Sequence, residues 1–127
     1  MADVDDGSIA DDASLLRRIR PDQIVDDENS GARRPSTAAF KDPALSADAE
    51  PILQSIGLDW KFSLQGYEGY SLAQFKAGHA RAKTLLVIHK PINGNPAHTE
   101  VHGKKTQGIA NHLVAGATWV HLETKGA

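Results

Sequence analysis

The sequence predicts a small α+β domain, with a mostly antiparallel sheet of three to four strands and two to three helices packed on one face. Two observations support this prediction. Short segments in which apolar and polar residues alternate, as in half-buried strands, are interspersed with segments whose apolar residues recur at helical spacing. The chain has 127 residues, enough for one hydrophobic core, so a multidomain protein is excluded.

The first thirteen residues are predicted to form a disordered acidic tail, which leaves residues 14–127 as the single domain. They include five aspartates and no basic residue, and they offer too little apolar surface to offset the entropy lost on ordering. The next apolar residues, between Leu15 and Val25, are interrupted by arginines and by Pro21. A short helical turn or an edge strand that ends at Pro21 is expected there.

Two helices and a strand are predicted in the middle of the chain. Ser46 can cap a helix with apolar residues on one face, and Gly57 can end it. Ser71 is the expected cap of a second helix, which runs to about Ala82. Between these helices, residues 60–64 alternate apolar and polar side chains, a pattern typical of a half-buried strand.

A β-hairpin is predicted in the last third of the chain. Residues 84–89 (TLLVIH) form the strongest strand pattern and are expected at the centre of the sheet. Asn93 and Gly94 then supply the two positive-φ positions of a tight turn. Residues 97–102 are therefore expected to pair antiparallel to the preceding strand.

The final elements are predicted to be a helix that begins near Lys105 and a strand over residues 118–122. Lys104 and Lys105 oppose the dipole of this helix, so a bound anion or an acidic partner would relieve a small electrostatic cost. Residues 1–59 hold thirteen acidic and six basic residues, whereas residues 60–127 hold three and eight. Such a split indicates either a polyanionic partner or an acidic segment that folds over a basic one.

Nucleic acid is one polyanion that the basic half can bind. Arg81, Lys83 and Lys90 would contact phosphates, and Tyr67 or Trp60 would offer stacking surfaces. The alternative is a solvated basic face covered by the acidic half of the chain. A sequence pI of about 6.3 favours this alternative.

Composition excludes several classes of protein. The chain contains no cysteine, which excludes a disulfide framework, a thiolate zinc site and a cysteine nucleophile, and which agrees with a cytoplasmic location. No apolar run approaches the ~18 residues that a membrane span needs, and the N-terminus lacks the basic and then apolar order of a signal peptide. We therefore expect a soluble cytoplasmic protein with no membrane partner.

The segment from His98 to His102 is the first candidate site. On a strand, His98, Glu100 and His102 project from the same face, so two imidazoles and a carboxylate can hold zinc or another divalent cation. The alternative is an exposed strand face without metal, because two histidines need further ligands to form a site. In an enzyme, these three residues are the candidate catalytic groups.

The segment from Arg33 to Thr37 is the second candidate site, for an anionic ligand. Arg33 and Arg34 can bind a phosphate or a carboxylate bidentately, and the hydroxyls of Ser36 and Thr37 add donors. The alternative is ordinary surface chemistry, in which the arginines neutralise the acidic residues 26–28 and the hydroxyls cap a turn.

The order of residues also resembles that of an ADP-ribosyltransferase. An arginine on an early strand (Arg17 or Arg18) would bind the dinucleotide phosphate, and a hydroxyl of the Ser-Thr pair (Ser36 and Thr37) would fix the ribose. Glu100, on a later strand, would stabilise the oxocarbenium-like centre. Common residue types also occur in a given order by chance.

The segments RRPSTAAF (33–40), NPAH (95–98) and GKKT (103–106) resemble a layout found in small bacterial proteins to which no established activity is attached. The resemblance covers about Leu15 to Val120 and implies a compact bacterial domain, but it implies no catalytic residue. Neither a phosphate-binding loop motif nor a dinucleotide-binding glycine motif is present in the sequence.

Two functional hypotheses follow. The first is a non-catalytic interaction module that binds a protein or an anionic ligand. The second is a small enzyme that acts on a nucleotide or a phosphate ester, as a metal-assisted hydrolase or like an ADP-ribosyltransferase. The enzyme would use Arg34, Ser36 and the face of residues 98–102, so these must line one pocket. A sheet this small has unprotected edges, which is compatible with a homodimer.

Overall fold

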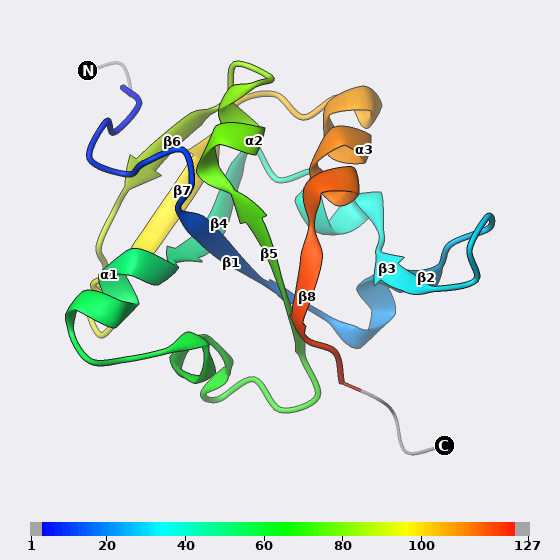
Figure 1. The fold of residues 1–127 in the computed structure, drawn as a ribbon, viewed down its shortest axis with the longest axis horizontal. Coiled ribbons are helices and arrows are strands. Elements are labelled where there is room, and N and C mark those ends of the chain that lie inside the picture. Colours follow the sequence, from blue (N-terminus) through cyan, green and yellow to red (C-terminus); the bar gives the residue numbers. More distant parts are fainter. Residues whose placement is uncertain (1–3, 124–127) are drawn as a thin grey trace.

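The computed structural model describes residues 4–123, which form an α+β domain around a six-stranded antiparallel sheet. The strand order is β6-β7-β4-β1-β5-β8, and β2 pairs with β3 in a separate small sheet (Figure 1). The strands are β1 (Ser14–Ile19), β2 (Ile24–Asp26), β3 (Arg33–Pro35), β4 (Ala44–Ala49), β5 (Ser71–Lys76), β6 (Leu86–His89), β7 (His98–His102) and β8 (Thr118–His121). The helices are α1 (Glu50–Ser55), α2 (Ala77–Arg81) and α3 (Gln107–Gly116), with short 3-10 helices η1 (Pro21–Gln23), η2 (Thr37–Phe40) and η3 (Trp60–Leu64).

The α+β class and the antiparallel sheet are confirmed, whereas the size of the sheet and the placement of the helices differ from the prediction. The sheet has six strands rather than three or four. Side chains of α2 and α3 pack on one face of the sheet, which we call the covered face. Side chains of α1 pack on the opposite face, which we call the pocket face. Helices therefore lie on both faces instead of one.

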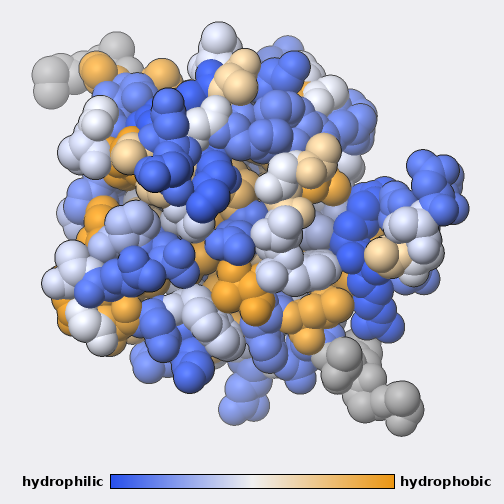
Figure 2. Space-filling view, in the orientation of Figure 1, coloured by the Kyte–Doolittle hydropathy of each residue, from blue (hydrophilic) through white to orange (hydrophobic). Residues whose placement is uncertain are grey.

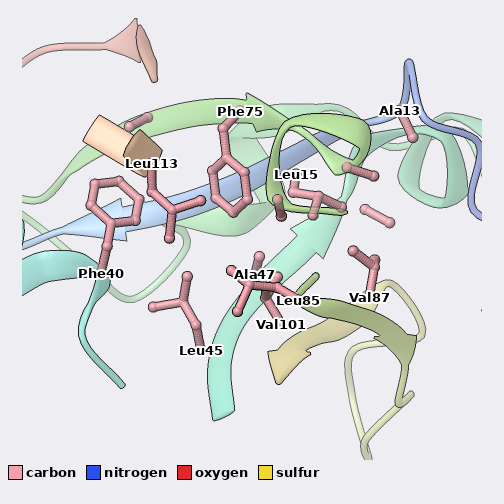
Figure 3. Close-up of a cluster of buried hydrophobic side chains, with 14 of the residues drawn as sticks. Ala13, Leu15, Phe40, Leu45, Ala47, Phe75, Leu85, Val87, Val101 and Leu113 are labelled. Atoms are coloured by element: carbon pink, nitrogen blue, oxygen red, sulfur yellow. The ribbon is translucent and has the colours of Figure 1, made fainter. Parts of the chain in front are cut away.

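The main hydrophobic core lies between the covered face and the helices α2, α3 and η2. Leu15, Leu45 and Phe75 project into it from three strands, and Leu113 of α3 packs against them (Figure 3). The ring of Phe75 meets the ring of Phe40 edge to face, with centroids 5.9 Å apart. Aromatic pairs in this geometry add to the free energy of burial, so the cluster fastens η2 and α3 to the sheet.

A smaller apolar cluster occupies part of the pocket face. Leu16 of β1 and Leu72 of β5 are buried there under Leu53 of α1 and the apolar side chains of η3. On β4 and β7 the same face bears polar side chains instead, among them Ser46 and His98. The pocket face is thus apolar on one half and polar on the other.

Both helices predicted in the middle of the chain begin as strands. Residues 44–49 form β4 before α1 starts at Glu50, and residues 71–76 form β5 before α2 starts at Ala77. Leu and Ala suit a helix as well as a strand, so the local pattern does not separate the two. Both segments are strands because each pairs with β1, which lies between them in the sheet. Gly57, at φ 78°, follows the end of α1 as predicted.

Two further predictions are corrected by the structure. Residues 60–64 form the 3-10 helix η3 rather than a strand, because the Asp59 carboxylate accepts a hydrogen bond from the backbone N–H of Lys61 (2.9 Å) and caps the turn. β1 is an interior strand rather than a helical turn or an edge strand. Its arginines interrupt the apolar pattern, yet Leu15, Leu16 and Ile19 on either side of them are buried.

β6 and β7 form the predicted antiparallel hairpin, but at the edge of the sheet rather than its centre. In the turn, Gly94 has a positive φ (83°) and Asn93 does not, so only one of the two predicted positions is confirmed. The outer edge of β6 is contacted by the N-terminal segment, where the Asp6 N–H donates to the Val87 carbonyl (2.7 Å). This cover lets an edge strand be as apolar as a central one.

Residues 4–13 pack against the domain, whereas the sequence predicts a disordered tail over residues 1–13, of which residues 1–3 lie outside the described part. Ile9 and Ala13 are buried in the main core. Composition misses this arrangement because two apolar side chains are enough to anchor a segment that is otherwise acidic.

Aspartates of the N-terminal segment bind Arg81 of α2. Its guanidinium donates to the carboxylates of Asp5 (3.0 Å) and Asp11 (2.8 Å) and to the carbonyl of Asp6 (2.8 Å). These hydrogen bonds hold the pKa of Arg81 above its ordinary value, although burial opposes them. The acidic segment thus neutralises a cation of the basic half, one of the two outcomes that the charge split suggests.

The last helix and strand are confirmed as α3 and β8. Thr106 caps α3 by accepting a hydrogen bond from a backbone N–H of the first turn (3.2 Å). The Lys105 ammonium donates to the carbonyls of Pro43, Val101 and Gly103 at 2.7–3.1 Å. Burial lowers the pKa of Lys105 to about 8. Its three donors are directed into the protein rather than toward an anion at the helix start.

Candidate functional site

The polar half of the pocket face contains a hollow of about 330 Å³ beside the β6–β7 turn. It lies between that turn, η3 and the strands β1, β4 and β7. Its lining consists of Arg18, Asp48, Phe62, Ser63, Gln65, Tyr67, Ile92, Asn93, Gly94, Asn95 and His98. Figure 2 shows that the face in view is largely hydrophilic, with small and separate apolar patches.

Asp48 of β4 is the centre of this site. Its side chain is 1% exposed, yet it accepts hydrogen bonds from the Ser63 hydroxyl (2.5 Å) and the Asn95 amide (2.8 Å). The guanidinium of Arg18 completes its surroundings, with Nη1 3.7 Å from Oδ2. A buried carboxylate needs such partners because desolvation is otherwise costly. Asp48 therefore fastens η3 and the β6–β7 turn to the sheet.

Arg18 of β1 is held in one orientation at the floor of the pocket. Its Nη1 donates to the Ser63 carbonyl (3.2 Å), and its guanidinium lies over the ring of Tyr67, 4.2 Å from the centroid. The side chain stays 24% exposed. Among the described residues, Nε and Nη2 make no hydrogen bond, so donors of a fixed cation remain available to a ligand.

The β6–β7 turn forms the rim. Ile92 and Asn95 exchange two backbone hydrogen bonds (3.1 and 2.9 Å), and Asn93 and Gly94 lie at the tip between them. Within the described chain, the backbone N–H groups of Asn93 and Gly94 have no acceptor. The Asn95 amide ties the turn to Asp48, so this rim has a defined position relative to Arg18.

His98 borders the pocket from β7. Its Nδ1 lies 2.8 Å from the Lys90 carbonyl and its Nε2 lies 3.3 Å from the Ser46 hydroxyl. The next residues on this face, Glu100 and His102, bind each other, with His102 Nε2 2.7 Å from a Glu100 carboxylate oxygen. The three side chains share one face as predicted, because β7 alternates, but their polar atoms are directed to different partners.

The zinc hypothesis finds no complete ligand set in residues 4–123, where no group of three His, Cys, Asp or Glu side chains is placed to hold a metal ion. Both ring nitrogens of His98 face other partners. The further ligands that a strand-borne histidine pair requires are not brought near in the described chain.

Arg33, Arg34, Ser36 and Thr37 lie elsewhere. Arg33 and Arg34 belong to β3, and Ser36 and Thr37 lie at the start of η2. Figure 1 places β3 and β7 at opposite sides of the molecule. Arg34 Nε is 3.5 Å from the Asp27 carboxylate, and the Thr37 hydroxyl accepts a hydrogen bond from the Gln107 amide (3.2 Å). The Arg34–Asp27 contact is the local neutralisation that the alternative describes, whereas Thr37 contacts α3 and Ser36 makes no capping hydrogen bond. The pocket lining contains none of these four residues.

The residue order that resembles an ADP-ribosyltransferase is not assembled into one pocket either. Arg17 faces away from the pocket and donates to the carbonyls of Ala39 (3.2 Å) and Ser46 (3.0 Å). Burial lowers the pKa of Arg17, and neighbouring Arg18 adds to the effect. Of the arginine, hydroxyl and glutamate positions, Arg18 alone lines the pocket that His98 borders.

The basic residues considered for nucleic acid are divided among separate contacts. Arg81 binds Asp5 and Asp11, and the ring of Trp60 stacks on His121 with centroids 5.6 Å apart. Lys90 Nζ lies 3.8 Å from Glu100. No helix of the described chain is long and apolar enough to cross a bilayer.

Sequence reasoning missed Asp48, Ser63 and Asn95, and it assigned Arg18 a different role. The available signal was an aspartate inside the apolar segment ALSADA, where a charge is unexpected. Comparison with known proteins adds no relative, since no family model, no curated protein and no solved structure matches the chain.

Proposed function

We propose that this protein is a binding module for a small anionic molecule, which it holds in the pocket between Arg18 and the β6–β7 turn. The observation that supports the proposal most strongly is the fixed guanidinium of Arg18, which stays partly exposed while Tyr67 and Ser63 hold it in place. The proposal retains the anionic ligand expected from the sequence and assigns it to Arg18 instead of Arg33 and Arg34.

The pocket supplies mainly hydrogen-bond donors. Arg18 provides charged N–H groups, and the tip of the turn adds the backbone N–H groups of Asn93 and Gly94. The negative charge of Asp48 is buried and already accepts two hydrogen bonds. A ligand rich in acceptors, such as a phosphate or a carboxylate, therefore matches the groups that are accessible.

Size and rigidity agree with a small ligand. A volume of about 330 Å³ lies at the lower end of the ~300–1,000 Å³ that is typical of small-molecule sites. Asp48 connects β4, η3 and the turn through its bonds to Ser63 and Asn95. A preformed site loses little entropy on binding, which favours measurable affinity despite the small contact area.

Calorimetric titration with inorganic phosphate and with succinate, at low ionic strength, tests the proposal. We expect Arg18→Gln to weaken binding about 10- to 100-fold, because a hydrogen bond to a charged group contributes ~1.5–3 kcal/mol. Arg34→Gln is the matched control and should leave binding unchanged. Equal losses in the two variants, or no binding of either probe to the native protein, would contradict the proposal.

A second pair of variants guards against misfolding, because Arg18 also contacts Asp48. Asn93→Asp places a negative charge on the exposed rim, where it repels an anion in the pocket, and Asn29→Asp makes the same change in the β2–β3 loop. We expect weaker binding of phosphate or succinate for the first variant alone. Unchanged affinity in both would place the ligand outside this pocket.

A further inference from the structure

Ser46 and His98 meet on the pocket face in an arrangement that goes beyond ligand binding. The Ser46 hydroxyl of β4 lies 3.3 Å from Nε2 of His98 on the adjacent strand. His98 Nδ1 lies 2.8 Å from the Lys90 carbonyl. A nucleophile within reach of a base, which is itself oriented by a third group, is the arrangement that activates serine in acyl transfer.

The Lys90 carbonyl fixes the tautomer of His98. A carbonyl oxygen can only accept a hydrogen bond, so Nδ1 must hold the proton and donate it. In the neutral imidazole, Nε2 is then an acceptor, and the Ser46 hydroxyl is the group that donates to it. The proton of Ser46 is thereby directed at the atom that would remove it.

Burial and access also suit a reacting pair. His98 is 8% exposed and borders the pocket, while Ser46 is half-buried. Glu100 lies opposite Ser46 on β7, but its carboxylate is bound by His102 (2.7 Å) and lies 3.8 Å from Lys90 Nζ. The Glu100 carboxylate therefore interacts with His102 and Lys90 rather than with the Ser46 hydroxyl.

We infer that Ser46 is a nucleophile, with His98 as its general base, for carboxylic esters whose anionic group occupies the pocket at Arg18. Ser46 Oγ forms a bond to the acyl carbon while its proton passes to His98 Nε2. The ester C–O bond then breaks, and the leaving alcohol takes this proton. Water then attacks the acyl carbon while its proton passes to His98 Nε2. The bond between Ser46 Oγ and the acyl carbon breaks, His98 returns the proton to Oγ, and the acid leaves.

The anionic character of the substrate rests on the proposed binding function, whereas the reactivity of Ser46 does not. Diisopropyl fluorophosphate separates the two, because it is small and neutral and needs no cation to bind. Its reaction forms an Oγ–P bond at serine and releases fluoride. Failure of phosphate or succinate to bind would therefore leave the reactivity of Ser46 to be decided by this reagent.

The experiment treats the full chain with diisopropyl fluorophosphate and maps the modified serines by peptide mass spectrometry. Ser55 is the internal control, because its exposed hydroxyl donates to the Ile52 carbonyl and has no histidine partner in the described chain. We expect modification of Ser46 at least about 100-fold faster than of Ser55, within the range of general-base catalysis. Equal rates for the two serines would overturn the inference.

His98→Gln tests the role of the base and should slow modification of Ser46 by about 100-fold. Modification of Ser46 at the native rate in this variant would overturn the assignment of His98. If His98→Gln does not fold, the ratio of the modification rates of Ser46 and Ser55 in the native chain decides whether Ser46 is activated. Burst release of p-nitrophenol from p-nitrophenyl acetate, absent in Ser46→Ala, gives a second readout of acyl transfer.

Discussion

The two faces of the central sheet use buried side chains in different ways. The covered face buries apolar residues such as Leu45 and Phe75 beneath α2 and α3. The polar half of the pocket face buries the carboxylate of Asp48, which is fully hydrogen-bonded. The first arrangement gives stability that depends on volume and shape. The second fixes the positions of η3 and the β6–β7 turn, because hydrogen bonds are directional and a buried polar group without a partner is costly.

The largest effect is expected from a cavity on the covered face. Phe75→Ala removes a fully buried ring that packs on Phe40, and it should lower the free energy of unfolding by about 3–5 kcal/mol. Urea denaturation at pH 7 measures the change. A loss below about 1 kcal/mol, within the range of volume-conserving changes, would show that the covered face is not the main core.

Asp48→Ala should have the next largest effect, about 2–4 kcal/mol, because it leaves Ser63, Asn95 and Arg18 without their shared acceptor. Asp12→Ala provides the matched control at an exposed carboxylate. Asp48→Ala should also weaken phosphate binding, because the β6–β7 turn loses the hydrogen bond between Asn95 and Asp48. Equal stability of the two variants would mean that Asp48 does not organise the pocket face.

Lys105 gives the covered side of the domain a dependence on pH. Burial lowers its pKa to about 8 in the folded protein, compared with an ordinary value of 10.5, so the unfolded chain binds more protons between these pH values. The free energy of unfolding should therefore rise with pH in this window, by at most about 1.4 kcal/mol per pH unit. Lys105→Met should abolish this rise in denaturation curves measured from pH 7.5 to 10. A rise of the same size in the variant would assign it to other groups.

The N-terminal segment tests how the edge of the sheet is protected. Asp5 accepts hydrogen bonds from Arg81 (3.0 Å) and from the backbone N–H of Val87 (2.8 Å). Asp5→Ala should therefore reduce the free energy of unfolding by about 1 kcal/mol. Deletion of residues 1–13 should lower the melting temperature further, because Ile9 and Ala13 leave the core. A melting temperature unaffected by the deletion would restore the disordered tail that composition predicts.

The smallest effect is expected where the pocket face is open. Glu100→Gln keeps the shape of the side chain and an acceptor for His102, so stability should change by no more than about 0.5 kcal/mol. Thermal unfolding is sufficient to detect a larger loss. Such a loss would mean that the Glu100–His102 pair stabilises the fold, as Asp48 does, rather than only occupying the open surface.

The sequence alone determines the class of the protein and the elements whose pattern is local. The hairpin of β6 and β7, the helix α3 and the strand β8 could be predicted, because a tight turn at Gly94 and the spacing of apolar residues in these segments depend only on residues close in the chain. The alternation of β7 likewise places His98, Glu100 and His102 on one face before any fold is known.

Only the tertiary structure decides between strand and helix for β4 and β5, since their pairing with β1 involves residues far apart in the chain. It also decides the site. Arg18, Asp48, Ser63 and Asn95 come from four separate segments, and they meet because strands β1 and β4 are neighbours. Arg33 and Arg34 have the more suggestive local pattern, yet they lie at the other side of the molecule, where Arg34 pairs with Asp27. A motif records adjacency along the chain, whereas a pocket depends on adjacency in space.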